Sequence, residues 1–212
     1  MAGKIYTVAQ QKGGAGKTTL AAHLAIAWSE VDLRVAVVDI DPQGSLTRWF
    51  QTRQEAMDGN VGLQHVQING WRTQREVERL AQDNDIVVID SPPHAETEAR
   101  IAVRSANLVI VPVQPSPMDM WATQPTLDLA RSESVPVLLV INRVPPRAKL
   151  ADDLIERIKG MGADVAQTQI GNRVQFAAAL FEGRSVTESA RKTRAAEEIQ
   201  ELAAEILKRG RR

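Results

Sequence analysis

The amino-acid sequence predicts an α/β fold in which helices cover both faces of a mainly parallel β-sheet. Short apolar runs rich in β-branched residues alternate with segments of helical periodicity, and several runs lead directly into glycine-rich or acidic segments. Near-continuous apolar runs are typical of parallel strands that are buried on both faces. Ligands of such sheets bind beyond the carboxyl ends of the strands, so functional residues are expected there.

Each element is placed by its own pattern. We expect strands over residues 5–9, 35–39, 63–67, 86–90, 108–113 and 135–141. We expect helices after residue 17, after residue 73, over residues 150–161 and over residues 199–206, where apolar side chains recur at helical spacing. Thr73 and Glu76 have the spacing of a capping box at a helix start. Glycines within residues 51–70 predict a surface loop before the short strand at 63–67.

Length and composition limit the possible functions. The 212 residues, of which 43% are hydrophobic and 25% charged, predict one folded domain over residues 1–212. Basic and acidic residues both number 26, so any contact with nucleic acid must use a local patch. The chain has no cysteine, which excludes disulfides, thiolate metal sites and cysteine-ligated iron–sulfur clusters. With no apolar leader or membrane span in the sequence, we expect a cytoplasmic protein.

A glycine-rich segment follows the first strand. Residues 11–19 read QKGGAGKTT, which fits K-G-G-x-G-K-[ST] completely and G-x-x-x-x-G-K-[ST] except at Gln11. Such glycines let backbone N–H groups converge on phosphate oxygens, and the next helix adds its positive end. The residues expected to bind phosphate are Gly13, Gly14, Ala15, Gly16, Lys17, Thr18 and Thr19. Lys17 is expected to reach the β- and γ-phosphates, and the alternative is a glycine-rich turn without a ligand.

The K-G-G-x-G-K-[ST] pattern resembles the deviant Walker A motif of the ParA/MinD family of P-loop ATPases. The resemblance implies ATP and Mg²⁺ as ligands, with the Thr18 hydroxyl on Mg²⁺ and Thr19 at the α-phosphate. It also implies that Lys12 crosses a dimer interface to the phosphates of the partner subunit, and therefore an ATP-dependent homodimer.

Carboxylates follow two further strands. Residues 39–45 read DIDPQGS, which resembles the family segment D-x-D-P-Q-G-[NS]. The resemblance implies that Asp41 orients the attacking water and that Asp39 lies near the Mg²⁺ shell; the alternative is a turn with Asp39 as a helix cap. Asp90 ends an apolar strand before Ser-Pro-Pro, as in the family's Walker B element, and is expected to bind Mg²⁺ through water. A cap on the following helix is the alternative for Asp90.

Two later strand ends resemble the family's adenine-binding loops. Pro112 and Pro115 lie in a proline-rich segment particularly similar to ParF-type plasmid partition ATPases, and Asn142 with Arg143 ends the next predicted strand. The resemblance places all four beside the base, although Asn142 is equally suited to be a turn former. Short ATPases of this type lack an N-terminal helix-turn-helix, so operator-specific autorepression is not expected.

The C-terminal part of the chain indicates a possible partner. Residues 171–212 carry nine basic and six acidic side chains, and we expect Arg173 and Arg184 to contribute to non-specific DNA binding, with a solvated surface as the alternative. The apolar stripe of residues 199–206 has no aromatic residue and lies among four acids, which is typical of core packing and poor for a membrane anchor.

The sequence therefore predicts a ParA-like ATPase that dimerises on ATP, binds the nucleoid and partitions or positions a cargo. A ParB-like or other adaptor is expected to stimulate hydrolysis. The alternatives are a MinD-like membrane-associated ATPase, a metabolic ATP-dependent ligase of the same fold, and a non-enzymatic adaptor.

Overall fold

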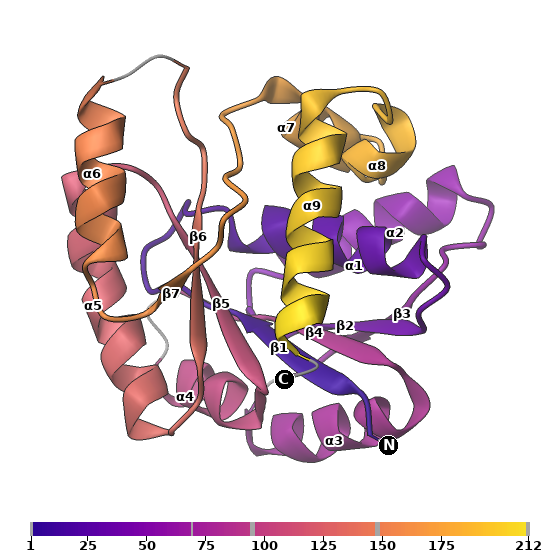
Figure 1. Cartoon of the computed structure of the whole chain (residues 1–212). Helices are drawn as coiled ribbons and strands as arrows, with labels where there is room; N and C mark the ends of the chain where they lie inside the picture. Colours follow the sequence, from indigo (N-terminus) through magenta and orange to yellow (C-terminus); the bar gives the residue numbers. More distant parts are fainter. Residues whose placement is uncertain (1, 69, 94–95, 147–148, 211–212) are drawn as a thin grey trace.

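The computed structural model describes residues 2–68, 70–93, 96–146 and 149–210 (Figure 1). In this part of the chain a seven-stranded parallel sheet has the order β3-β2-β4-β1-β5-β6-β7. The strands are β1 (Lys4–Val8), β2 (Val35–Asp39), β3 (Gln64–Gln67), β4 (Ile86–Asp90), β5 (Leu108–Val113), β6 (Val137–Ile141) and β7 (Asp164–Val165). The predicted α/β fold with a mainly parallel sheet is confirmed.

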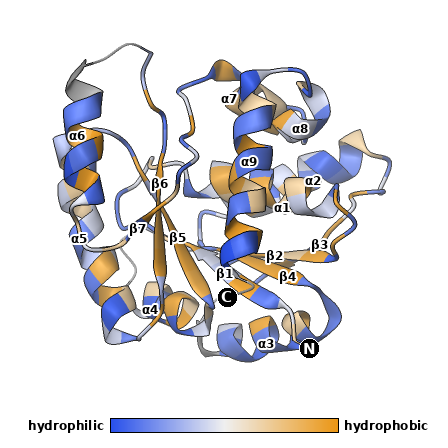
Figure 2. Ribbon diagram, viewed as in Figure 1, coloured by the Kyte–Doolittle hydropathy of each residue, from blue (hydrophilic) through white to orange (hydrophobic). Residues whose placement is uncertain are grey.

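Helices cover both faces of the sheet. They are α1 (Lys17–Ser29), α2 (Ser45–Ala56), α3 (Thr73–Asp83), α4 (Glu96–Ser105), α5 (Pro117–Ser132), α6 (Lys149–Lys159), α7 (Val174–Phe181), α8 (Val186–Ser189) and α9 (Arg194–Arg209). The buried clusters place α1, α2, α7, α8 and α9 on one face and α3 to α6 on the other. This two-sided cover explains why the central strands are largely apolar, as Figure 2 shows most clearly for β5 and β6.

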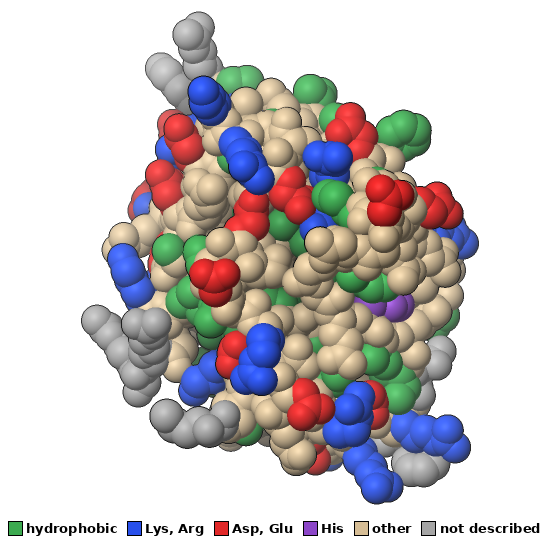
Figure 3. All heavy atoms as spheres, turned by 90° about the vertical axis from the view of Figure 1, so that its right-hand side faces the viewer, with side chains coloured by type: hydrophobic (Ala, Val, Ile, Leu, Met, Phe, Trp, Pro, Cys, Tyr) green, Lys and Arg blue, Asp and Glu red, His purple; other side chains and the backbone are tan. Residues whose placement is uncertain are grey.

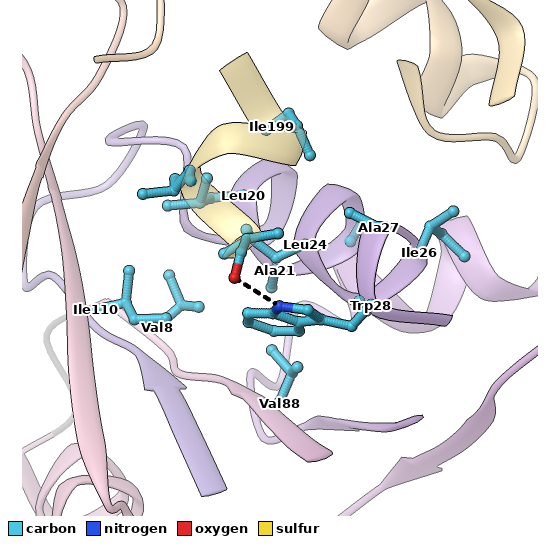
Figure 4. Packing of buried hydrophobic residues seen from close by; sticks show 14 of the residues in the cluster. Val8, Leu20, Ala21, Leu24, Ile26, Ala27, Trp28, Val88, Ile110 and Ile199 are labelled. Carbon is cyan, nitrogen blue, oxygen red and sulfur yellow. Dashed lines mark hydrogen bonds between the residues drawn. The ribbon is translucent and has the colours of Figure 1, made fainter. Parts of the chain in front are cut away.

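The largest part of the core lies between the sheet and helices α1 and α9. Trp28 of α1 is fully buried there, and its indole N–H donates to the carbonyl of Ala203 in α9 over 3.1 Å (Figure 4). Val8 and Val88 face the same cluster from neighbouring strands. Helix α1 is therefore held firmly against the sheet, which fixes the position of the loop that precedes it.

Sheet register brings the predicted functional segments to one edge. Strand β1 lies between β4 and β5, and Val8 pairs with Asp90 at the ends of their strands. Asp39 at the end of β2 also pairs with Asp90. The loops that follow β1, β2 and β4 therefore emerge side by side.

Helix α9 packs as the sequence predicts. Ile199, Leu202 and Ile206 are each at most 1% exposed, so the apolar stripe belongs to the core. Among the described helices, none combines the length and apolarity that crossing a bilayer would take.

Three local predictions differ from the structure. Thr73 is the first residue of α3 and is buried; the helix continues from a 3₁₀ turn (Gly70–Arg72), and Arg72 at the cap position makes no side-chain capping bond. The predicted capping box is therefore wrong, and Glu76 bonds to Arg79 instead. Residues 51–56 continue α2 and do not form a loop. Helix α6 ends at Lys159, before the predicted end at residue 161.

Candidate nucleotide-binding site

The loop between β1 and α1 has the backbone of a phosphate cradle. Gly14 and Gly16 have positive φ angles of 78° and 93°, which side chains with a Cβ rarely adopt. A Cβ built on Gly13 or Gly14 would meet no atom of the described residues within 4 Å, so the space above the loop is open. Helix α1 begins at Lys17 without a side-chain cap, which leaves its first N–H groups for an anion.

Thr18 and Asp90 meet beside this cradle. The Thr18 hydroxyl donates to Asp90 Oδ2 over 2.6 Å, while Asp90 Oδ1 is buried without a hydrogen-bond partner among the described residues. Burial raises the pKa of Asp90 to about 7, and the charge of neighbouring Asp39 acts in the same direction. A fully buried carboxylate with an unused oxygen is an unfavourable arrangement that a cation would relieve.

Lys17 supplies positive charge to the same place. Its side chain is 7% exposed, and its ammonium lies 3.5 Å from the carbonyl oxygen of Lys12. Burial lowers the pKa of Lys17, whereas the charges of Asp90 and Asp41 raise it. Lys17 is therefore a buried cation at the phosphate loop, and the charges of two nearby carboxylates favour its charged form.

These residues fit Mg²⁺ together with a phosphate ligand. Within the described residues there is no group of three or more His, Asp or Glu side chains suited to holding a metal ion. Mg²⁺ retains several waters and takes its remaining ligands from one or two carboxylates and substrate phosphates. Thr18 and Asp90 would provide the protein's share of such a site.

Both carboxylate oxygens of Asp39 accept hydrogen bonds from neighbouring segments of the chain. Its Oδ1 accepts the Asp41 N–H at 3.0 Å, and its Oδ2 accepts the N–H and hydroxyl of Thr47, both at 2.8 Å. Asp39 is fully buried beside Asp90. The structure therefore places Asp39 next to the predicted metal position, with Oδ1 bonded to the loop after β2 and Oδ2 bonded to the first turn of α2. The bonds to Thr47 agree with the helix-cap alternative. Asp41 is half-buried, and its Oδ1 accepts the Gln43 N–H.

Lys12 contacts its own chain. Its ammonium donates to Asp119 Oδ2 over 2.5 Å, and the Ser116 hydroxyl donates to the same oxygen. Asp119 lies in the first turn of α5 and is 1% exposed. Lys12 is predicted to contact the phosphates of a partner subunit. In this single chain it is instead held at the rim of its own site by an intramolecular ion pair.

A cavity of about 230 Å³ opens beside the cradle. The residues that line it are Gly16, Thr19, Leu20, His23, Asn142, Arg143, Ile170, Gly171, Asn172, Arg173, Val174, Phe176, Ala177 and Ile199. The Asn142 amide donates to the carbonyl of Ala15 over 2.8 Å, and Arg143 donates to that of Gly14 over 3.0 Å. Asn142 and Arg143 therefore join the phosphate loop to this cavity.

The proline-rich segment does not line this cavity. Pro112 is buried inside β5, and half-buried Pro115 follows the strand. Residues 170–174, 176 and 177 line the cavity, and their contribution was not predicted from the sequence. Residues 170–173 are similar to a late segment of the ParA/MinD family, but no spacing in the sequence indicates that they lie near the glycine loop after β1.

The two predicted DNA contacts differ in their surroundings. Arg173 forms a bidentate pair with Glu198, at 2.6 and 3.1 Å, so its charge is compensated. Arg184 is half-buried, and its side chain has no hydrogen bond or ion pair to the described residues. On the face that Figure 3 shows, basic and acidic side chains are interspersed.

Comparison with known proteins gives the same fold and a family. Residues 6–186 match the CobQ/CobB/MinD/ParA nucleotide binding domain. The maintenance of carboxysome distribution protein A of Halothiobacillus neapolitanus is 31% identical over 208 residues, which cover 94% of each chain. The chromosome partitioning protein ParA of Myxococcus xanthus is 24% identical over 98% of this chain and 89% of the relative.

Solved structures of low identity share the fold. The ATP complex of a McdA variant from Cyanothece superposes with a TM-score of 0.83 at 18% identity, covering 98% of this chain and 97% of the other. The Pyrococcus furiosus cell division ATPase MinD gives a TM-score of 0.77 at 19% identity, covering 97% and 99%.

Proposed function

Because the chain belongs to the CobQ/CobB/MinD/ParA family of nucleotide-binding domains, we propose that it is a ParA-like Mg²⁺-dependent ATPase that positions a cargo. The single observation that carries this proposal is the convergence of an open glycine loop, buried Lys17 and the Thr18–Asp90 pair at one edge of the sheet. Phosphoryl transfer requires charge compensation and positioning more than covalent chemistry, and this set supplies both.

Each residue has a distinct role in the proposed reaction. Backbone N–H groups of residues 13–16 bind the phosphates, and Lys17 compensates the charge of the terminal ones. Thr18 and Asp90 hold Mg²⁺, which neutralises charge on the phosphate oxygens when it is bound. Asp41 orients the attacking water.

Asp39 acts indirectly, because its oxygens accept hydrogen bonds from Asp41 and from the start of α2 and thereby position both. The cavity lined by Asn142, residues 170–174, Phe176 and Ala177 accepts the base, in place of the proline-rich segment.

ATP binding is coupled to dimerisation in this proposal. Lys12 leaves Asp119 and contacts the phosphates bound by a second copy. The dimer binds DNA non-specifically and associates with the nucleoid until an adaptor stimulates hydrolysis. The carboxysome-distribution relative favours a protein assembly as cargo over a plasmid. The buried stripe of α9 disfavours the membrane-associated alternative.

DNA retention tests the switch. With ATP, the wild type is expected to bind random duplex DNA with an affinity that falls steeply with salt, because cationic contacts release counterions. Arg184→Glu should weaken binding more than Arg173→Glu, since Glu198 already compensates Arg173. Arg75→Glu, on an exposed face of α3, is the matched charge-reversal control. Equal retention on DNA with ADP would contradict the ATP-dependent switch, and retention on anionic liposomes with none on DNA would exclude DNA binding.

The metabolic alternative makes a different prediction. A ligase of the same fold would hydrolyse ATP in fixed proportion to a small carboxylic acid, and neither DNA nor an adaptor would change its rate. ATP turnover measured with DNA and without any small acid therefore separates the two functions.

A further inference from the structure

A line of hydrogen bonds runs from β3 to the loop that carries Asp41. The Thr47 hydroxyl donates to Asp39 Oδ2 over 2.8 Å, and His65 Nε2 lies 3.0 Å from the same hydroxyl oxygen. Asp39 Oδ1 accepts the Asp41 N–H. Three segments that are separate in the sequence, at the end of β2, in α2 and in β3, are thus joined through one buried carboxylate.

The donors and acceptors of this line follow from the single proton of the threonine hydroxyl. Thr47 donates that proton to Asp39 Oδ2. The Thr47 oxygen then accepts from His65, whose Nε2 must carry a proton. The line therefore has one direction, from His65 through Thr47 to Asp39.

The histidine ring has little freedom to turn away. It stacks on Phe50 of α2 with ring centroids 4.6 Å apart and planes 18° apart. Phe50 is itself 8% exposed and belongs to the main core cluster. The packing of Phe50 in the core therefore holds the His65 ring in the position from which it bonds to Thr47.

The line ends beside the reaction site without entering it. Asp41 lies in the loop after β2, which emerges beside the end of β4 and Asp90, whereas neither Thr47 nor His65 lines the cavity beside the phosphate loop. Removing the Thr47 hydroxyl would leave Asp39 Oδ2 with the Thr47 N–H alone. The carboxylate would then be held by two backbone N–H groups in place of three donors, so the acceptor of the Asp41 N–H would be positioned less firmly.

We propose that Thr47 and His65 are positioning residues for ATP hydrolysis, which hold Asp39 so that Asp39 holds the Asp41 backbone in place. The proposal rests on the proposed ATPase function. Hydrolysis depends on the placement of the attacking water, and a displacement of about 1 Å at a reacting group lowers rates on the order of a hundredfold. ATP binding depends on the glycine loop and Lys17, which this line does not touch.

Paired variants at each position separate positioning from packing. Thr47→Val keeps the shape and removes the hydroxyl, whereas Thr47→Ser keeps the hydroxyl. His65→Phe keeps an aromatic ring over Phe50 and removes the donor, whereas His65→Gln keeps an N–H donor. Thr52→Val is the control in the same helix, because within the described part of the chain the Thr52 hydroxyl bonds only to the carbonyl of Arg48.

The measurement is steady-state phosphate release against ATP concentration in Mg²⁺, beside ATP affinity and thermal unfolding. We expect Thr47→Val and His65→Phe to lower kcat about tenfold or more while KM changes less than about twofold, as for an interaction needed only in the transition state. Thr47→Ser and His65→Gln should recover most of the rate, and Thr52→Val should match the wild type.

The outcomes separate this inference from the proposed function. A wild type that binds no ATP and releases no phosphate overturns the proposed function. A wild type that turns over while Thr47→Val and His65→Phe keep its kcat overturns the positioning role. Equal losses of ATP affinity, stability and rate in both variants, without recovery in Thr47→Ser or His65→Gln, also overturn it, because they indicate packing alone.

Discussion

The three glycines of the phosphate loop are predicted to respond differently to the same substitution, alanine. Gly16→Ala would place a Cβ 2.6 Å from Asn142 Nδ2 and force a side chain into a φ of 93°. Gly14→Ala forces a side chain into a φ of 78°, but its Cβ would lie in open space. Gly13→Ala requires no positive φ, and its Cβ would contact no atom of the described residues. The fold thus requires glycine at position 16, and a phosphate ligand is the remaining reason for one at position 13.

These differences give a graded series of stabilities. A left-handed backbone costs about 1–2 kcal/mol for a residue with a Cβ, which is the expected loss for Gly14→Ala. Gly16→Ala adds the hydrogen bond from Asn142 to Ala15, about 1 kcal/mol, for a total of about 2–3 kcal/mol. Gly13→Ala is expected to leave the free energy of unfolding unchanged or to raise it by about 0.4–1 kcal/mol, because alanine restricts the unfolded chain.

Urea unfolding without nucleotide and titration with a fluorescent ATP analogue measure the two effects separately. We expect Gly13→Ala to be as stable as the wild type and to bind ATP about tenfold or more weakly, since in the proposed site its methyl group would occupy open space that the phosphate oxygens need to reach the N–H groups. If Gly13→Ala destabilised the free protein as much as Gly16→Ala, or bound ATP normally, the geometry of the cradle would be refuted.

Two further predictions concern stability. Burial lowers the pKa of His23 to about 4, below its ordinary 6.5, so the unfolded chain takes up the proton first and stability is lost as the pH falls from about 6.5 towards 4. The stability of the wild type relative to His23→Gln should fall by about 2 kcal/mol between pH 7.5 and pH 5 in urea unfolding, and a constant difference would contradict this. Arg53 is 4% exposed and joins α2 to Glu188 of α8 by a bidentate pair at 2.7 and 2.8 Å, so Arg53→Met should cost about 3–5 kcal/mol by leaving that carboxylate unpaired. A loss below about 1 kcal/mol would show that the pair is not effectively buried.

Much of the site was predictable because its residues follow strands directly. Strand β1 leads into the glycine loop, and Asp39 and Asp90 each end a strand. Parallel register then brings these ends together without further information. The sequence indicates Lys17 and Thr18 for the same reason, since they follow the glycines in one motif.

The rest of the site depends on contacts that no local pattern encodes. Residues 170–177 reach the cavity from far along the chain, and His65 meets Thr47 only because β3 lies beside β2. Spacing also does not reveal that the Asp39 oxygens are occupied. At Thr73, the turn formed by the preceding residues overrides the capping pattern.

Magnesium-dependent phosphate release from ATP by the wild type and by Lys17→Ala tests the central claim most directly. Lys17 is buried at the start of α1, directly after the glycine loop, so in the proposed function its loss would remove the charge that compensates the terminal phosphates. The proposed function predicts phosphate release by the wild type that requires Mg²⁺ and falls about a hundredfold or more in Lys17→Ala. Equal phosphate release by the two proteins would contradict it.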